Sequence, residues 1–188
     1  MAWQKQHKLQ SKERILTSAA ALFTRFGFEK ISINQVMENA DMTRGAFYAH
    51  FSSKSDLYAQ AIGKAANQAA NQQLDGQPQC LKILSERYLN TAHRDQQMEY
   101  LCPLASLITD INQQDETVKA TYTELFKQFL GNTNQYTQNE QRALQTSALM
   151  IGGLALAKAL HDKELSDKLL NACQNAISDL LSISGESA

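Results

Sequence analysis

The residues whose types and spacing suggest a defined chemistry lie in one short segment, residues 43–51, and at Lys54 just beyond it. Phe47 and Phe51 are four residues apart, so on a helix they share one face and can be buried together. Arginine and lysine attract phosphates, and small residues allow the backbone to approach base edges closely. The pattern predicts a short helix that binds the major groove of double-stranded DNA. Its small or polar positions are Thr43, Arg44, Gly45, Ala46, Tyr48 and His50.

The elements before this segment are those needed to hold it in place. Apolar residues at helical spacing predict a helix over residues 11–26, and Gly27 suits the position just past its end. Ser32 and Gln35 have the spacing of a capping box, which predicts a second, short helix. Residues 40–42 then predict a tight turn, with Thr43 capping the next helix through residue 50. Two short helices joined by such a turn form a helix-turn-helix.

A wider pattern in residues 11–62 resembles the DNA-binding domain of the TetR family of transcriptional regulators. The resemblance implies that Tyr48, His50 and Lys54 contact phosphates and that residues 43–46 lie at base edges; Ser32 completes the expected DNA-binding set. Ala49 departs from the family pattern, where a second aromatic residue or histidine is common. The resemblance rests on these groups: Arg14-Ile15-Leu16, Ala20-Ala21-Leu22-Phe23, Gly27-Phe28, Ile31-Ser32-Ile33, Thr43-Arg44-Gly45-Ala46-Phe47-Tyr48-Ala49-His50-Phe51 and Ser53-Lys54.

The expected fold is all-α, with about nine helices in two domains. Residues 8–68 are predicted to form the helix-turn-helix domain, and residues 76–184 a helical ligand-binding and dimerisation domain, because residues 75–78 (Asp-Gly-Gln-Pro) are typical of a linker. The later helices are expected at residues 78–94, 102–111, 115–137, 140–161 and 166–182. The resemblance implies a repressor that binds an inverted-repeat operator as a homodimer and responds to a small-molecule inducer.

Four residues near the C-terminus are predicted to lie in a homodimer interface. Gly152 and Gly153 permit a close approach between helices, while Leu169 and Ile177 belong to an apolar face on the next helix. An ordinary pair of core helices is the alternative. The sequence also favours a salt bridge at a capped helix end for residues 93–95, His-Arg-Asp.

The three cysteines, at positions 80, 102 and 173, have no C-x-x-C spacing, and the four histidines are scattered, so no metal or other cofactor is expected. Cys102 precedes Pro103, which suits the first position of a helix, so Cys102 is a candidate N-cap. A thiolate there would face the positive end of the helix dipole, which makes Cys102 a possible sensor of oxidants or electrophiles. A small buried residue is the alternative.

Charge and composition narrow the function further. Residues 1–60 carry eight Lys and Arg against five Asp and Glu, while the chain as a whole has a formal net charge of −1, so a polyanion is expected at the N-terminal end. The first ten residues are polar and no apolar run is long enough to span a bilayer, which favours a cytoplasmic location without a membrane partner. Neither a catalytic triad nor paired carboxylates can be recognised, which argues against an enzyme. A helical enzyme, a helical adaptor and an activator stay open as alternatives.

Overall fold

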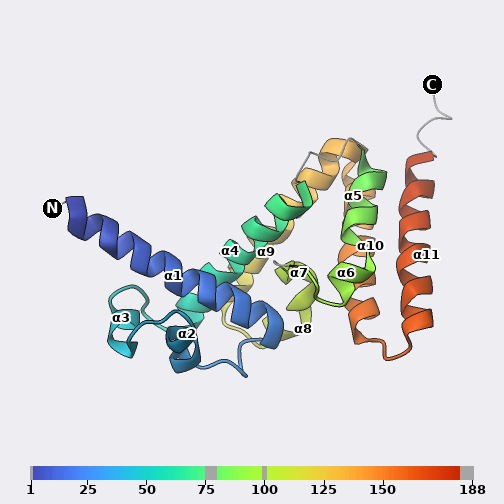
Figure 1. The fold of residues 1–188 in the computed structure, drawn as a ribbon. Coiled ribbons are helices and arrows are strands. Elements are labelled where there is room, and N and C mark those ends of the chain that lie inside the picture. The colour runs from blue at the N-terminus through green and yellow to red at the C-terminus, as the bar shows by residue number, and fades with distance from the viewer. Residues whose placement is uncertain (1, 75–79, 99–100, 183–188) are drawn as a thin grey trace. The chain divides into compact units, whose positions relative to one another are not determined.

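The structure is a computed structural model that describes residues 2–74, 80–98 and 101–182. Every regular element in these ranges is a helix, which confirms the predicted all-α class (Figure 1). None of these helices combines the length and the apolar character that crossing a membrane requires. In chain order the helices are α1 (Ala2–Phe26), α2 (Ile33–Asn39), α3 (Arg44–Tyr48), α4 (Lys54–Leu74), α5 (Leu81–Tyr88), α6 (Thr91–Arg94), α7 (Pro103–Ser106), α8 (Ile108–Ile111), α9 (Glu116–Thr137), α10 (Glu140–Ala159) and α11 (Lys163–Ser182).

The described ranges contain eleven helices where about nine were expected, because two predicted helices are interrupted. The helix predicted over residues 78–94 is divided into α5 and α6. Leu89 leaves the helical conformation with a ψ of 62°, and the side chain of Asn90 then caps α6. The helix predicted over residues 102–111 is likewise divided into α7 and α8 at Leu107.

The helices group into two compact units. The first unit combines Met1–Gln68 with Tyr100–Glu124, and the second combines Ala69–Glu99 with Leu125–Ala188. The sequence-based boundary had placed residues 100–124 with the regulatory domain, whereas in the structure α7, α8 and the start of α9 pack with α1 to α4. The functional division into residues 8–68 and 76–184 stays a prediction.

In the first unit, polar side chains of α1 donate hydrogen bonds to the middle and to the C-terminal end of α2. The hydroxyl of Ser18 donates to the carbonyl oxygen of Val36 (2.8 Å), and the guanidinium of Arg14 donates to the carbonyl oxygen of Ala40 (2.7 Å). The turn to α3 passes through Asp41, whose φ of 51° is a left-handed conformation that aspartate tolerates. The helices enclose an apolar core that includes Ile15, Phe23, Val36, Met37, Phe47 and Phe51.

In the second unit, α5, α10 and α11 lie side by side (Figure 1). Gly153 of α10 is buried at the closest approach, where a Cβ atom would lie 2.7 Å from the Sγ atom of Cys173 in α11. The small residue therefore sets how closely these two helices pack, since any side chain would push α11 away.

Candidate nucleic-acid interface

The recognition elements begin at a capped helix. Ser32 is the N-cap of α2: its Oγ atom accepts a hydrogen bond from the backbone nitrogen of Gln35 (3.2 Å), and its own backbone nitrogen donates to Gln35 Oε1 (2.8 Å). This is the predicted capping box, which satisfies two backbone donors at once. Ser32 is exposed, so the structure leaves it at the surface expected of a DNA contact.

Helix α3 presents opposite sides to the core and to solvent. Phe47 is fully buried and stacks on Phe51 at 5.7 Å between ring centroids, as the spacing predicted. Tyr48 is 61% exposed although it is the next residue, because adjacent positions of a helix point in different directions. Arg44 and Gly45 are exposed as well, and no atom outside the local chain lies within 4 Å of a Cβ built on Gly45. The exposed side of α3 is therefore small, polar and open.

Two details of α3 differ from the expectation. The helix ends at Tyr48 rather than at residue 50, because Ala49 and His50 form the turn that leads to Phe51. Thr43 occupies the N-cap position, but its side chain makes no capping hydrogen bond. Thr43 is exposed, so its side chain lies at the surface and takes no part in capping.

His50 stays on the same surface but is anchored to α1. Its Nε2 atom lies 2.8 Å from the hydroxyl of Ser11, and the side chain is half-buried. Partial burial and the positive charges of Lys8 and Lys12 hold the pKa of His50 below its ordinary value of 6.5, so the ring is neutral at neutral pH. The lysines rather than the histidine therefore supply positive charge at this edge.

Lys8 and Lys12 are functional candidates that the sequence reasoning did not single out. Both lie on α1 close enough to His50 to lower its pKa, and the Nζ atom of Lys12 is 5.6 Å from the centroid of the Phe51 ring. The signal available in the sequence was their spacing of four residues, which puts both lysines on one face of a helix. That face could not be matched to α3 without the tertiary structure.

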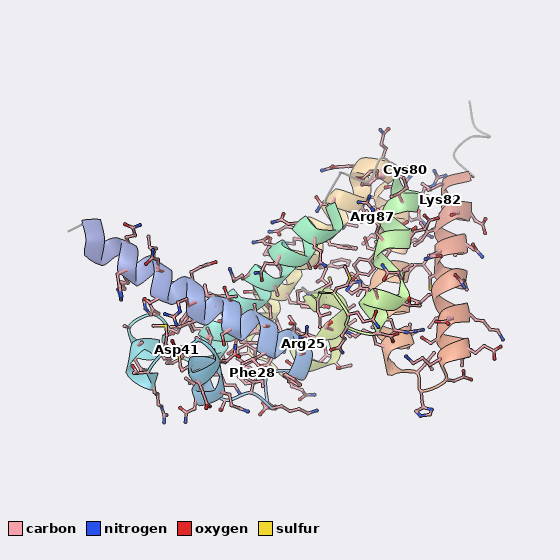
Figure 2. All side chains as sticks on the ribbon, viewed as in Figure 1. Arg25, Phe28, Asp41, Cys80, Lys82 and Arg87 are labelled. Atoms are coloured by element: carbon pink, nitrogen blue, oxygen red, sulfur yellow. The ribbon has the colours of Figure 1, made fainter. Side chains whose placement is uncertain are left out.

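Lys54 begins α4, directly after the polar segment that follows α3. Its Nζ atom lies 4.0 Å from the centroid of the Phe28 ring, a cation–π contact, and the residue is only partly exposed. Figure 2 shows Phe28 in the segment that follows α1. Lys54 is therefore held by an aromatic side chain from another part of the helix-turn-helix.

Comparison with known proteins agrees with this geometry. The sequence profile described as "Bacterial regulatory proteins, tetR family" matches residues 15–61, the segment that contains the C-terminal part of α1, all of α2 and α3, and the start of α4. A crystal structure of a TetR-family transcriptional regulator from Cytophaga hutchinsonii superimposes with a TM-score of 0.76 over 92% of this chain and 96% of that one, at 15% identity. The chain belongs to the TetR family of helix-turn-helix transcriptional regulators.

Two relatives show how far sequence similarity to other TetR-family regulators extends. An uncharacterized HTH-type transcriptional regulator of Lactococcus lactis subsp. lactis is 26% identical over 81% of this chain and 85% of its own length. The HTH-type transcriptional repressor BepR of Brucella suis biovar 1 is 34% identical, but over 30% of this chain and 27% of its own length. Similarity to relatives such as BepR is thus confined to about a quarter of their length.

Cys102, the predicted sensor, is the N-cap of α7, and Pro103 follows as the first helical residue, as expected. Its side chain makes no capping hydrogen bond and is 6% exposed. The thiol is buried in the first unit, so an oxidant would reach it only after a local opening of that unit.

The four residues predicted for the dimer interface divide into two groups. Gly153 is buried against Cys173 and Leu89 of the same chain, and Ile177 is fully buried, so both belong to the core of the second unit. Gly152 and Leu169 keep part of their surface exposed and remain candidates for a contact between chains. Gly152 has no atom within 4 Å of a built Cβ, which distinguishes it from its neighbour.

Residues 93–95 form the capped, salt-bridged helix end that the sequence favoured. Asn90 caps α6 by accepting a hydrogen bond from the backbone nitrogen of His93, and Arg94 pairs with Asp95 at 2.9 Å. Arg94 also donates to Ser166 (3.1 Å) and pairs with Asp167 of α11. These contacts connect α6 to α11 and give residues 93–95 a structural role.

Proposed function

We propose that this chain is a repressor that binds operator DNA through the exposed side of α3 and the lysines beside it. The observation that carries the proposal is the orientation of α3, in which Phe47 is fully buried while Arg44, Gly45 and Tyr48 are exposed. A buried anchor fixes the helix, and its open side has the size and polarity that base-edge and phosphate contacts require. The name of the BepR repressor supports repression as the mode of action. We also propose that the chain acts by binding rather than catalysis, in the cytoplasm.

The test uses duplexes enriched from a random DNA pool by the wild-type chain. Lys54→Ala should weaken binding to all sequences and lower the slope of log Kd against log salt by about one, because a phosphate contact carries no sequence information. Arg44→Ala should reduce the preference for the enriched sequence by about 1–3 kcal/mol if Arg44 contacts a guanine. Lys82→Ala, an exposed charge in the second unit, is the matched control. Unchanged affinity and preference in both variants would refute the proposal.

The proposed repressor acts as a homodimer formed through α10 and α11. One face of α10 and one face of α11 carry apolar side chains that the chain itself leaves partly or fully exposed; Leu156 is 59% and Leu165 is 50% exposed. Small residues between them permit close contact with a second copy. The faces consist of Ala148, Leu149, Gly152, Ala155, Leu156 and Ala159 on α10, and Leu165, Leu169, Ala172 and Ala176 on α11.

A symmetric dimer predicts an inverted-repeat operator with half-sites about one turn of DNA (~34 Å) apart or slightly more. Leu156→Glu should convert the protein to monomers in analytical ultracentrifugation and weaken binding to the repeat, because it places a charge in an apolar contact. Leu9→Glu introduces the same charge at a leucine of α1 that is 61% exposed and serves as the control for the oligomeric state. A Leu156→Glu variant that remains dimeric would place the interface elsewhere.

We further propose that a small-molecule inducer binds in the second unit near His93. The ring is fully buried, and its Nδ1 atom lies 2.9 Å from the carbonyl oxygen of Tyr88, to which it donates. Nε2 is therefore a hydrogen-bond acceptor, and it has no partner among the described residues. Tyr88 packs edge-on against His93 at 5.0 Å and against Phe129 of α9 at 5.5 Å. This environment suits a neutral, flat molecule with an O–H or N–H donor.

Thermal shift measurements with a panel of neutral phenols and aromatic alcohols test the inducer proposal. A bound ligand raises the melting temperature of the folded chain. We expect at least one compound to stabilise the wild type and to release DNA, and to do neither in His93→Phe, which keeps the ring and removes the acceptor. A compound that acts equally on both proteins would show that His93 is not part of the inducer site.

A further inference from the structure

One carboxylate from the later part of the chain reaches into the DNA-binding part of the first unit. Asp110 of α8 accepts hydrogen bonds from the backbone nitrogen of Phe28, at 3.2 Å to Oδ1 and 3.3 Å to Oδ2. Its Oδ2 atom also accepts a hydrogen bond from the hydroxyl of Tyr58 in α4 at 2.5 Å. Burial, followed by this hydrogen bond, raises the pKa of Tyr58, so the phenol keeps the proton that it donates. Asp110 thus ties together the end of α1 and the start of α4.

The backbone around this contact fits the carboxylate closely. Gly27 has a φ of 81°, the left-handed conformation that ends α1, and a Cβ on it would lie 2.9 Å from Asp110 Oδ1. The glycine both turns the chain and leaves space for the carboxylate. Phe28 is then directed toward Tyr58, with ring centroids 5.1 Å apart.

The same phenylalanine holds a residue of the proposed DNA interface. Lys54 Nζ lies 4.0 Å from the centroid of Phe28, so the ring that Asp110 fixes through the backbone positions the ammonium group of Lys54. Two contacts in series therefore join Asp110 to a phosphate-binding residue that is 56 positions away in the sequence.

We propose that Asp110 is a positioning residue for DNA binding, which sets operator affinity by placing Phe28 and, through it, Lys54. The inference rests on the proposed function.

The test is a double-mutant cycle on DNA affinity, using the full-length chain and the duplex enriched by the wild type. Asp110→Ala should weaken binding about tenfold, the effect typical of losing a hydrogen bond to a charged group, and should lower the salt slope by about one, as Lys54→Ala does. In a chain that already carries Lys54→Ala, Asp110→Ala should change the affinity by less than about twofold, because the two residues act in series. Glu116→Ala removes an exposed carboxylate from the same segment and should change nothing.

Two further variants keep the outcome clear if Asp110→Ala unfolds. Tyr58→Phe removes one donor and leaves the bond to Phe28, and Asp110→Asn leaves only one acceptor oxygen; both should show smaller losses that also vanish in the Lys54→Ala background. Hydrogen exchange at the Phe28 amide should quicken in the Asp110 variants. Equal losses with and without Lys54 would mean a purely structural role and overturn the inference. If Lys54→Ala and Arg44→Ala leave DNA binding unchanged, the proposed function fails first.

Discussion

The helix-turn-helix and the second unit arrange their polar side chains differently. In the helix-turn-helix, Ser32 exchanges hydrogen bonds with Gln35, three positions away and at the surface. In the second unit, Arg94 is 8% exposed and bonds to Ser166, 72 positions away, and to Asp167, 73 positions away. A local surface pair forms together with the helix that contains it and stabilises the folded chain by about 1 kcal/mol. Buried long-range pairs form only when the whole unit is folded, and their loss should cost more.

The largest effect is expected at Arg94, whose hydrogen bonds to Asp95 and Asp167 raise its pKa and keep it charged. Arg94→Ala should lower the free energy of unfolding by about 2–4 kcal/mol in urea titrations, since it removes several charged hydrogen bonds and buried packing. Lys163→Ala removes the exposed partner of Asp95 and should cost less than about 1 kcal/mol. Similar costs for the two variants would contradict the distinction between buried and surface pairs.

The next effect is a loss of stability in acid that belongs to His93. Burial lowers the pKa of His93 from 6.5 to about 4 in the folded chain, so between these values the unfolded chain binds a proton that the folded chain does not. Stability should therefore fall as the pH falls through this window, by about 2 kcal/mol at pH ~5 relative to neutral pH. His93→Gln should lose most of this pH dependence in urea titrations, while His161→Gln, at an exposed position, should keep it. If His93→Gln keeps it as well, another group is responsible.

A pair of adjacent glycines gives a smaller and more specific test. Gly153→Ala should lower the free energy of unfolding by about 1–3 kcal/mol, because the new methyl group meets Cys173 Sγ at 2.7 Å. In the Leu156→Glu background, which is expected to be monomeric, Gly152→Ala should instead raise it by about 0.5–1 kcal/mol, since alanine favours a helix and the site is open within the chain. Cys173→Ala should relieve the cost at Gly153 in the double variant. Changes of the same sign for the two glycines, or a gain at Gly153 with a loss at Gly152, would contradict the packing of α10 on α11.

The smallest effect on stability is expected at the surface pair of Ser32 and Gln35. Ser32→Ala should lower the free energy of unfolding by about 1 kcal/mol, because the backbone nitrogen of Gln35 loses the hydroxyl that accepts its hydrogen bond at the start of α2. Thr43→Ala should cost less, since Thr43 makes no capping hydrogen bond. Thermal unfolding followed by circular dichroism measures both. An effect of Ser32→Ala as large as that of Arg94→Ala would remove the contrast between the two regions.

The same contrast explains which features could be predicted from the sequence. The capping box at Ser32, the left-handed Gly27 and the burial of Phe47 beside an exposed Tyr48 depend on residues within four positions, so the pattern contains them. The sequence missed Lys8, because its proximity to His50 depends on how α1 crosses α3. The DNA-binding residue set remains a prediction; the structure places Tyr48 in α3, His50 in the turn after it and Lys54 at the start of α4.

In the second unit the composition indicated helices but did not indicate which helices pack against one another. Both Gly152 and Gly153 have the small size that close packing needs, and only the structure shows which of them touches Cys173. Residues 100–124 lie with α1 to α4, and the hydrogen bond from Phe28 to Asp110 is one of the contacts that hold them there. The two residues are 82 positions apart, so no local sequence pattern predicts this contact.

Residues 100–124 belong to the first unit, which affects how a chimera between two such regulators should be designed. A fragment that ends at Gln68 would leave the N–H of Phe28 and the O–H of Tyr58 without the carboxylate that accepts both. A chimera that fuses another regulatory domain to residues 1–68 alone would therefore leave these two hydrogen-bond donors without their acceptor. An exchange that keeps α7, α8 and the first turns of α9 together with α1 to α4 preserves these hydrogen bonds, because the first compact unit is discontinuous along the chain.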